Sequence, residues 1–440
     1  MSLFALCLGL FMVIVDVMIV TVALPNIASG LSGSISSLQW IVDGYTLMFT
    51  CLLLSAGNVG DRLGARTAFI AGLVLFVLTS IGCGLAPSIS ILTVFRFLQG
   101  MAGAFILPTS VALINASYDD KKARSNAIGI WAMIGGVAAA SAPLLGAVIT
   151  TFFGWRGVFF VNIPIGIIAI ALTMKYVVSP SSKPSSGFDL TGQISAIIAL
   201  ASLAFGLIEA GRVGWLSGIV LSAFFIFLIS TMAFLLIEYF SKHPMVPLSF
   251  FRSHVFASTM MVGIILNISF FGILFTLPLY FQEIRGYSVL MSGIALTPLM
   301  LFSPISSYLS GKMTSAIGSR LPMIMGLSLG ALGFFGLLMV GGNAPTYGWL
   351  VLPLTAIGLG ASFTMPAATI AIIHSLPSDR AGIASGLFNT SRQLGSLIGV
   401  AIFGTIISTS SSFMSGMHTS LVMAGCIYLV GAILCFFAKK

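Results

Sequence analysis

The fold is decided by the stretch Leu3-Phe-Ala-Leu-Cys-Leu-Gly-Leu-Phe-Met-Val-Ile-Val-Asp16-Val-Met-Ile-Val-Thr-Val-Ala-Leu-Pro25. It carries a single charge, and about 20 apolar residues are enough to cross a bilayer as a helix. The stretch is longer than the apolar region of a signal peptide, and no basic residue precedes it. We therefore expect a retained membrane span with a carboxylate in its middle.

The composition extends this interpretation to the whole chain. Of the 440 residues, 58% are hydrophobic and 7% are charged, with a mean hydropathy of +1.13. Soluble domains carry about 25% charged residues, so the sequence predicts an all-α integral membrane protein. The net charge of +9 is no sign of nucleic-acid binding in such a chain. No disulfide framework or metal site is expected, because every cysteine lies in an apolar stretch: Cys7, Cys51, Cys83, Cys426 and Cys435.

Fourteen apolar runs of spanning length lie between polar breaks. No run alternates with a period of two, as barrel strands would, so we predict a bundle of fourteen transmembrane helices. The predicted spans lie near 3–25, 38–57, 67–86, 90–114, 125–151, 157–178, 190–210, 215–239, 255–281, 289–310, 321–342, 347–373, 382–408 and 418–437.

The basic residues orient these spans. Placing the N-terminus inside the cell puts most of the 19 lysines and arginines on the cytoplasmic side, as the positive-inside rule requires. We therefore expect a multi-pass protein of the inner (plasma) membrane with both termini in the cytoplasm. The cytoplasmic set is Arg62, Arg66, Lys121, Lys122, Arg124, Lys175, Lys183, Lys242, Arg252, Lys312, Arg320, Arg380, Lys439 and Lys440.

An internal repeat divides the chain. The loop after the second span has glycines at 57 and 64 and arginine at 66, and the loop after the tenth repeats them at 311, 318 and 320. Such repeats are typical of transporters that rock two halves around a central site. A Pro/Ser-rich linker covers 179–187. We predict a six-helix bundle over 1–178, a linker with two inserted helices over 179–253, and a second six-helix bundle over 254–440.

Several motifs carry a resemblance to a known family. The loop reads Gly57-Asn-Val-Gly-Asp61-Arg62-Leu-Gly64-Ala-Arg66, the first span ends Val15-Asp16 to Leu24-Pro25, and the fourth contains Arg96-Phe-Leu-Gln99-Gly100. Together with Gly154-Trp155-Arg156 and Asn162-Ile-Pro164, they resemble the major facilitator superfamily, and within it the fourteen-helix drug:proton antiporters. The resemblance implies a monomeric transporter, not an enzyme. It further implies energy from a proton gradient without a cofactor, and small hydrophobic or cationic substrates.

The resemblance also implies roles for two segments. In the loop at 57–66, Gly57, Asp61, Arg62, Gly64 and Arg66 match a conformational latch between the two halves, although Val59 and Ala65 depart from the motif. The alternative is a short loop with basic topology signals. The fifth span keeps an antiporter element in Pro143 and Gly146, with alanines at 138, 142 and 147 in place of its glycines. A plain packing face is the alternative there.

The charges inside spans are the candidate machinery. At 1.5 Å per residue, Asp16 lies about 13 Å and Arg96 about 9 Å from the outer face, so they can pair. Our hypothesis makes Asp16 the proton site and Arg96 its modulator, against the alternative of polar side chains snorkelling to an interface. Arg392, within the thirteenth span, faces either the repeat interface or a carbonyl.

Asp43, Trp40 and Tyr45 lie near the outer mouth and form the candidate substrate site. An acid with aromatic neighbours suits lipophilic cations, and the alternative is an interfacial acid bonded to water. Glu209 and Glu283 are expected at the interface.

These features favour a proton-coupled antiporter that exports hydrophobic, cationic drugs by alternating access. The alternative function is export of one specific metabolite or antibiotic. An intramembrane enzyme is disfavoured because the sequence has no HExxH or GxSxG element, and no Walker loop for ATP occurs.

Overall fold

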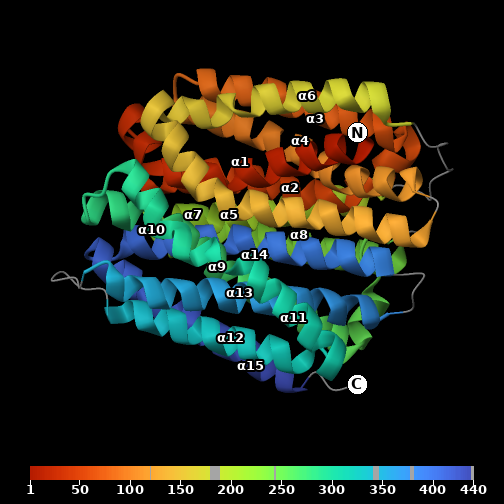
Figure 1. The fold of residues 1–440 in the computed structure, drawn as a ribbon. Helices are drawn as coiled ribbons and strands as arrows, with labels where there is room; N and C mark the ends of the chain where they lie inside the picture. Colours follow the sequence, from red (N-terminus) through yellow and green to blue (C-terminus); the bar gives the residue numbers. More distant parts are fainter. Residues whose placement is uncertain (119, 179–188, 242–243, 340–345, 377–380, 438–440) are drawn as a thin grey trace. The chain divides into compact units, whose positions relative to one another are not determined.

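The computed structural model is all-helical over the part of the chain that it describes (Figure 1). The described residues are 1–440 except 119, 179–188, 242–243, 340–345, 377–380 and 438–440. Side chains are described throughout those residues except at 54, 57–59, 61–62, 121, 125, 381–382 and 437.

Within the described residues, each of the fourteen apolar runs lies mainly on helix. The first eight helices are α1 (Ser2–Leu31), α2 (Ile35–Leu63), α3 (Ala65–Leu85), α4 (Ile89–Ser117), α5 (Lys121–Phe160), α6 (Asn162–Tyr176), α7 (Leu190–Val213) and α8 (Gly218–Phe240). The others are α9 (His254–Leu279), α10 (Val289–Leu301), α11 (Ser303–Ile317), α12 (Arg320–Gly336), α13 (Gly348–His374), α14 (Ala381–Thr409) and α15 (Phe413–Phe437). Short helical turns cover Leu248–Arg252, Tyr280–Ile284 and Leu337–Met339.

Twelve helical segments of the described chain are long and apolar enough to cross a membrane. The apolar helix α6 is shorter, with 15 residues, and α2 extends over 29 residues. The protein is thus a multi-pass membrane protein, as the composition predicted.

Several predicted boundaries differ from the structure. The loop predicted over 57–66 is helix up to Leu63, because α2 continues past the apolar run to the turn at Gly64. The tenth run, predicted over 289–310, is two helices, α10 and α11, which break at Phe302 and continue to Ile317. Pro304 follows the break, and proline is tolerated in the first turn of a helix because the amide it lacks would be unbonded there. The fifth and sixth runs meet at Gly154, whose φ of 71° interrupts α5. Glycine adopts this conformation without the cost that a Cβ imposes.

The chain forms two compact units. The first comprises Met1–Ile197, Ser241–Met245 and Gln282–Ile294, and the second comprises Ile198–Phe240, Val246–Phe281 and Ala295–Lys440. In the first unit α1 packs on α5 and α6, α2 packs on α4, and α3 packs on α4 and α6. In the second unit α9 packs on α14 and α15, and α12 packs on α13 and α15.

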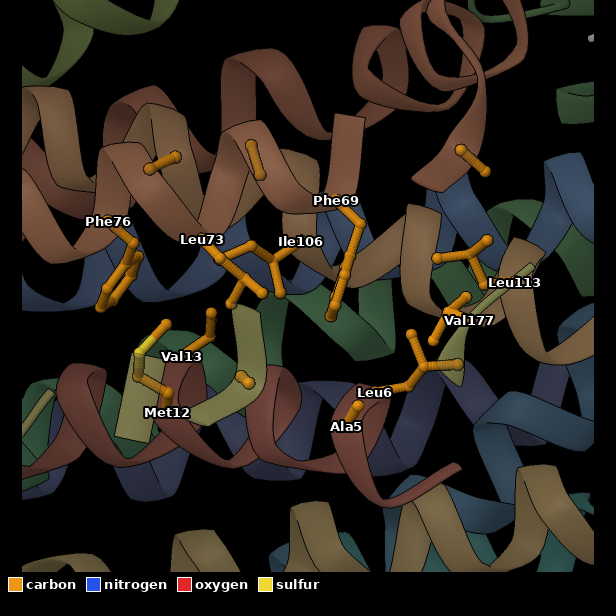
Figure 2. Packing of buried hydrophobic residues seen from close by; sticks show 14 of the residues in the cluster. Ala5, Leu6, Met12, Val13, Phe69, Leu73, Phe76, Ile106, Leu113 and Val177 are labelled. Carbon is orange, nitrogen blue, oxygen red and sulfur yellow. The ribbon is translucent and has the colours of Figure 1, made fainter. Parts of the chain in front are cut away.

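A hydrophobic cluster holds the first unit together around α1, α3 and α4 (Figure 2). Met12 and Val13 of α1 face Phe69, Leu73 and Phe76 of α3, and all five side chains are buried. These helices are membrane spans, where the alternative to packing is contact with lipid, so the stabilisation comes from van der Waals packing between helices and not from removal of water. Because this packing immobilises α1, it also determines the direction in which Asp16 points.

The sequence repeat has a structural counterpart. Gly64 ends α2 with φ 87°, and Gly318 ends α11 with φ 85°. Both values lie in the region that favours glycine, so each helix stops at a residue that tolerates the turn. The repeated glycines therefore mark the same local event, a helix end followed by a reversal.

Candidate functional site

A buried ion pair links α1 to α4. Asp16 and Arg96 expose 0% and 1% of their side chains, and Arg96 Nη1 lies 2.5 Å from Asp16 Oδ2. The pairing that the two depths made possible is present in the structure. Neither charge reaches the outside of its helix bundle, so the snorkelling alternative does not describe this pair.

Two amides complete the surroundings of the carboxylate. Asp16 Oδ1 accepts hydrogen bonds from Gln99 Nε2 at 3.0 Å and from Asn162 Nδ2 at 2.7 Å. The same two amides donate to Ser80 Oγ, at 2.7 Å and 3.2 Å. The carboxylate therefore receives a guanidinium and two amide donors, an arrangement that suits its ionised form. All four side chains are buried.

The guanidinium is equally enclosed. Arg96 Nε donates to the carbonyl oxygen of Ile41 at 3.1 Å, and Nη1 also donates to Gln99 Oε1 at 2.8 Å. Its Cζ lies 4.4 Å from the centre of the Tyr45 ring and 6.0 Å from that of Phe159. Cation–π contact of this kind stabilises a desolvated cation by about 2 kcal/mol. Protein groups therefore compensate both charges, and neither side chain is exposed to solvent.

Close helix packing makes this arrangement possible. A Cβ at Gly100 of α4 would lie 2.1 Å from the carbonyl oxygen of Tyr45 in α2. Only a residue without a side chain allows the backbones to approach so closely. The approach brings the Tyr45 ring and the Ile41 carbonyl to Arg96, one turn before Gly100 on α4.

The sequence did not predict a role for three members of this network. Gln99 and Asn162 stood only inside family-like motifs, and Ser80 was not singled out. The available signal was an amide inside an apolar span, which is costly unless it is hydrogen-bonded. For Ser80 no such signal exists, because a serine can bond to its own helix backbone.

Asp43 lies elsewhere on α2. Its side chain is fully buried, and neither carboxylate oxygen accepts a hydrogen bond from a described residue. Buried Ser36, Thr46 and Thr50 lie three or seven residues from it, so these polar residues share one face of α2. This polar face of α2 runs along a membrane helix, where buried polar groups are expensive.

Of the two predicted aromatic neighbours of Asp43, Trp40 lies three residues before it on the same side of α2, and Tyr45 does not. Tyr45 is two residues away, about 200° around the helix, and its ring packs over Arg96. Trp40 packs against Phe97 of α4, with ring centres 6.1 Å apart. The structure therefore places Tyr45 with the Asp16–Arg96 pair, which corrects the expectation that it lines one site with Asp43.

The residues predicted to form the latch are only partly described. The side chains of Asp61 and Arg62 and residue Gly57 lie outside the residues whose side chains the structure describes. Arg66 Nη2 donates to the carbonyl oxygen of Met174 at the end of α6, at 2.6 Å. Together with the turn at Gly64, this bond joins α3 to α6 within the first unit.

The segment predicted to be an antiporter element lies in the middle of α5. Gly146 faces α1, where a Cβ would lie 3.0 Å from the carbonyl oxygen of Ile19. Pro143 is part of the same helix, and its carbonyl oxygen would lie 2.9 Å from a Cβ at Gly293. The small residues therefore allow close helix contact, three residues along α1 from Asp16. Close contact agrees with the packing alternative and is compatible with an antiporter role.

Comparison with known proteins places the chain in a family. Residues 6–400 match the model of the Major Facilitator Superfamily. The chain is 32% identical to the methylenomycin A resistance protein of Streptomyces coelicolor, over 98% of this chain and 90% of that protein. It is 33% identical to the multidrug resistance protein Stp of Mycobacterium tuberculosis (93% and 76%) and 35% identical to the drug efflux pump JefA of the same organism (91% and 79%).

The fold also matches solved structures. A peptide transporter POT crystallised with sulfate superimposes with a TM-score of 0.75, over 99% of this chain and 94% of that chain. A bacterial homologue of the lysosomal transporter Spinster, in an inward-facing and unoccupied conformation, matches with a TM-score of 0.71. At 15% and 18% identity these likenesses concern the fold alone. Because the family model matches residues 6–400 and the relatives align over most of the chain, the chain belongs to the major facilitator superfamily of membrane transporters, not to an enzyme family.

Proposed function

We propose that the protein is a proton-coupled antiporter that exports hydrophobic, cationic drugs or toxic compounds across the plasma membrane by alternating access. The named relatives that it resembles over most of its length are resistance proteins and a drug efflux pump. The observation that supports coupling of export to protons is the buried carboxylate of Asp16, which is paired with Arg96.

Asp16 is proposed as the proton site because its charge is matched inside the first unit. Protonation would remove the negative charge opposite Arg96 and convert one acceptor oxygen into a donor. The network of Gln99, Asn162 and Ser80 would then have to rearrange. Since Asp16 is sealed from solvent here, coupling requires a second conformation in which it loses a donor and meets water. A proton taken up in one conformation and released in the other would then drive export.

Asp43 is proposed as the site that attracts cations. Its buried oxygens accept no hydrogen bond from the described residues, and burying an uncompensated carboxylate is costly. A positively charged substrate beside it would supply the compensating charge. Trp40, one turn before it on α2, stays a candidate substrate contact, whereas Tyr45 acts through Arg96.

The proposed topology has fourteen spans with both termini in the cytoplasm. Helices α2 and α6 add to the twelve long apolar segments, and the basic residues gather on the side assigned to the cytoplasm. Two six-helix bundles over 1–178 and 254–440, with inserted helices between them, agree with the repeat. We propose that the protein works as a monomer, with 57–66 as its latch and α5 as its antiporter helix.

Transport in proteoliposomes tests the proposed function directly. Purified protein is reconstituted, and uptake of the fluorescent cation ethidium is followed with and without an imposed pH gradient. We expect accumulation only when the gradient drives protons against the dye, and dissipation of the gradient should release the dye. Ethidium movement that ignores the gradient would contradict proton coupling. A pump that rejects unrelated dyes and carries one compound would favour the specific exporter.

Asp43→Asn tests the cation site. We expect the KM for ethidium to rise about tenfold, because a charge-assisted contact contributes about 1.5 kcal/mol or more. The KM for an uncharged substrate should change less than twofold. Asp43→Glu keeps the charge and serves as the control, with a smaller effect on ethidium. Equal losses for charged and uncharged substrates in Asp43→Asn would exclude a role in cation recognition.

A further inference from the structure

Arg392 is a second intramembrane cation, and the Asp16 network does not use it. It lies on α14, nine residues past Ile383 in the apolar segment Ile383–Thr409. At 1.5 Å per residue it is about 14 Å along that segment, well inside a hydrocarbon core about 30 Å thick. Charged residues at such depth almost always face the bundle interior or a water-filled cavity and are functional candidates.

No carboxylate neutralises Arg392 within the described part of the chain. The two ion pairs found there are Asp16–Arg96 and Glu209–Arg212. The other described acid in the spans of the second unit, Glu238, accepts a hydrogen bond from the backbone amide of Val246 at 3.1 Å. The described acids that share this unit with Arg392 are therefore engaged elsewhere.

The hydrogen bonding of Arg392 is also incomplete. Its Nη1 donates to Asn389 Oδ1 at 3.1 Å, one turn earlier on α14. Its Nε is buried and has no hydrogen-bond partner among the described residues. With Nη1 engaged, the edge formed by Nε and Nη2 remains, and the two N–H groups of that edge point in parallel. This is the geometry that binds the two oxygens of one carboxylate.

The contrast with Arg96 shows what is lacking. Arg96 uses both Nε and Nη1, has Asp16 as its counter-ion and lies under an aromatic ring. Arg392 has one amide contact and no counter-ion in the described residues. Burying a cation without such compensation is costly unless something else supplies the negative charge.

The face of α14 that carries Arg392 is polar. Ser385, Asn389 and Ser396 lie seven and three residues before it and four after it, which places all four side chains on one side of the helix. The neighbouring face packs on α9, where a Cβ at Gly395 would lie 2.4 Å from the carbonyl oxygen of Ile264. Asn389 is exposed and Arg392 is half-buried, so the described chain covers this polar face only in part.

We propose that Arg392, with Asn389 beside it, binds the carboxylate of an acidic substrate. This inference rests on the proposed export function and extends its substrate class from cations to hydrophobic carboxylic acids. Arg392 receives the two oxygens on its Nε–Nη2 edge, while Asn389 holds the guanidinium in place through Nη1. The acidic group then provides the counter-charge that Asp16 provides for Arg96.

The test compares a hydrophobic acid with its own ester. Proteoliposomes containing wild type, Arg392→Gln or Arg392→Lys are given pyrenebutyrate, its methyl ester or ethidium. We expect Arg392→Gln to raise the KM for pyrenebutyrate at least tenfold and those for the ester and ethidium less than twofold. Arg392→Lys, which keeps the charge but loses the fork, should fall between wild type and Arg392→Gln for the acid. Arg252→Gln, which removes an exposed charge before α9, is the matched control and should change none of them.

Binding to the purified proteins in detergent separates this inference from the export function. Pyrene fluorescence gives the Kd of the acid, which should also rise at least tenfold in Arg392→Gln, and a thermal melt checks that the variant is folded. If the proteoliposomes export neither pyrenebutyrate nor ethidium but this shift in Kd is present, the proposed export function is wrong and the carboxylate site is supported. The proposal would be overturned if the Kd shifted equally for acid and ester, or if the acid did not bind to the wild type. It would also be overturned if Arg392→Gln were unfolded and Arg392→Lys had the wild-type Kd.

Discussion

Asp16→Asn is expected to abolish proton-driven accumulation of substrate while leaving exchange of substrate across the membrane intact. Asparagine has nearly the same shape as aspartate, and its oxygen can still accept from Gln99 or Asn162. It cannot take up and release a proton. The variant also leaves Arg96 without its counter-ion, so a lower Tm is expected. The folded variant should still bind and exchange dye, yet reach only the level set by the dye's own gradient.

Two assays on one preparation measure this. Accumulation is followed under an imposed pH gradient, and counterflow is followed with dye on both sides and no gradient. Asp120→Asn is the matched control, because Asp120 caps α5 through a 2.8 Å bond to the amide of Ala123 and asparagine caps equally well. If Asp16→Asn still accumulated dye against the gradient of the dye, Asp16 would have no role in proton coupling. A variant that loses counterflow as well would point to a structural role.

Arg96→Met is expected to destabilise the protein by about 3–5 kcal/mol, because it leaves the carboxylate of Asp16 buried without its cation. Methionine fills much of the space of the arginine stem but supplies neither the charge nor the bonds to Ile41 and Gln99. Thermal unfolding in detergent should show a large fall in Tm. Adding Asp16→Asn should recover part of the loss, since the uncompensated charge is then gone.

The pair Glu209–Arg212 on α7 provides the comparison. Its N···O distance of 2.7 Å is similar and Glu209 exposes 11% of its side chain, but Arg212 exposes 61% of its own, so water screens the pair. Arg212→Met should therefore cost about 0–1 kcal/mol. If Arg96→Met and Arg212→Met lowered the Tm equally, or if Asp16→Asn made Arg96→Met worse, the buried pair would not be the electrostatic unit inferred from its geometry.

Much of the fold could be predicted from local patterns. Apolar runs of spanning length specify helices because a backbone in lipid must satisfy its own hydrogen bonds, whatever the neighbouring helices are. The repeated glycines at 64 and 318 were placed in equivalent loops by the sequence and end equivalent helices in the structure, because their conformation is a property of one residue. The break between α10 and α11 at Phe302 was missed, because the hydropathy of the run continues across it.

The candidate site could be predicted only in part. Depth along a helix is a linear quantity, so the sequence was sufficient to set Asp16 and Arg96 at matching levels. Which residues lie around them depends on helix rotation and on close approaches such as Gly100 on Tyr45, which involve segments far apart in the chain.

The sequence by itself determined that this is a helical membrane protein of the major facilitator superfamily with a few charges held in its spans. Only the tertiary structure decided how those charges are partnered. It gathered Gln99, Asn162 and Ser80 around Asp16 and turned Tyr45 toward Arg96, while Arg392 received a single amide. The physical reason is that the cost of a buried charge is set by the groups within a few ångströms of it, and packing between helices selects those groups.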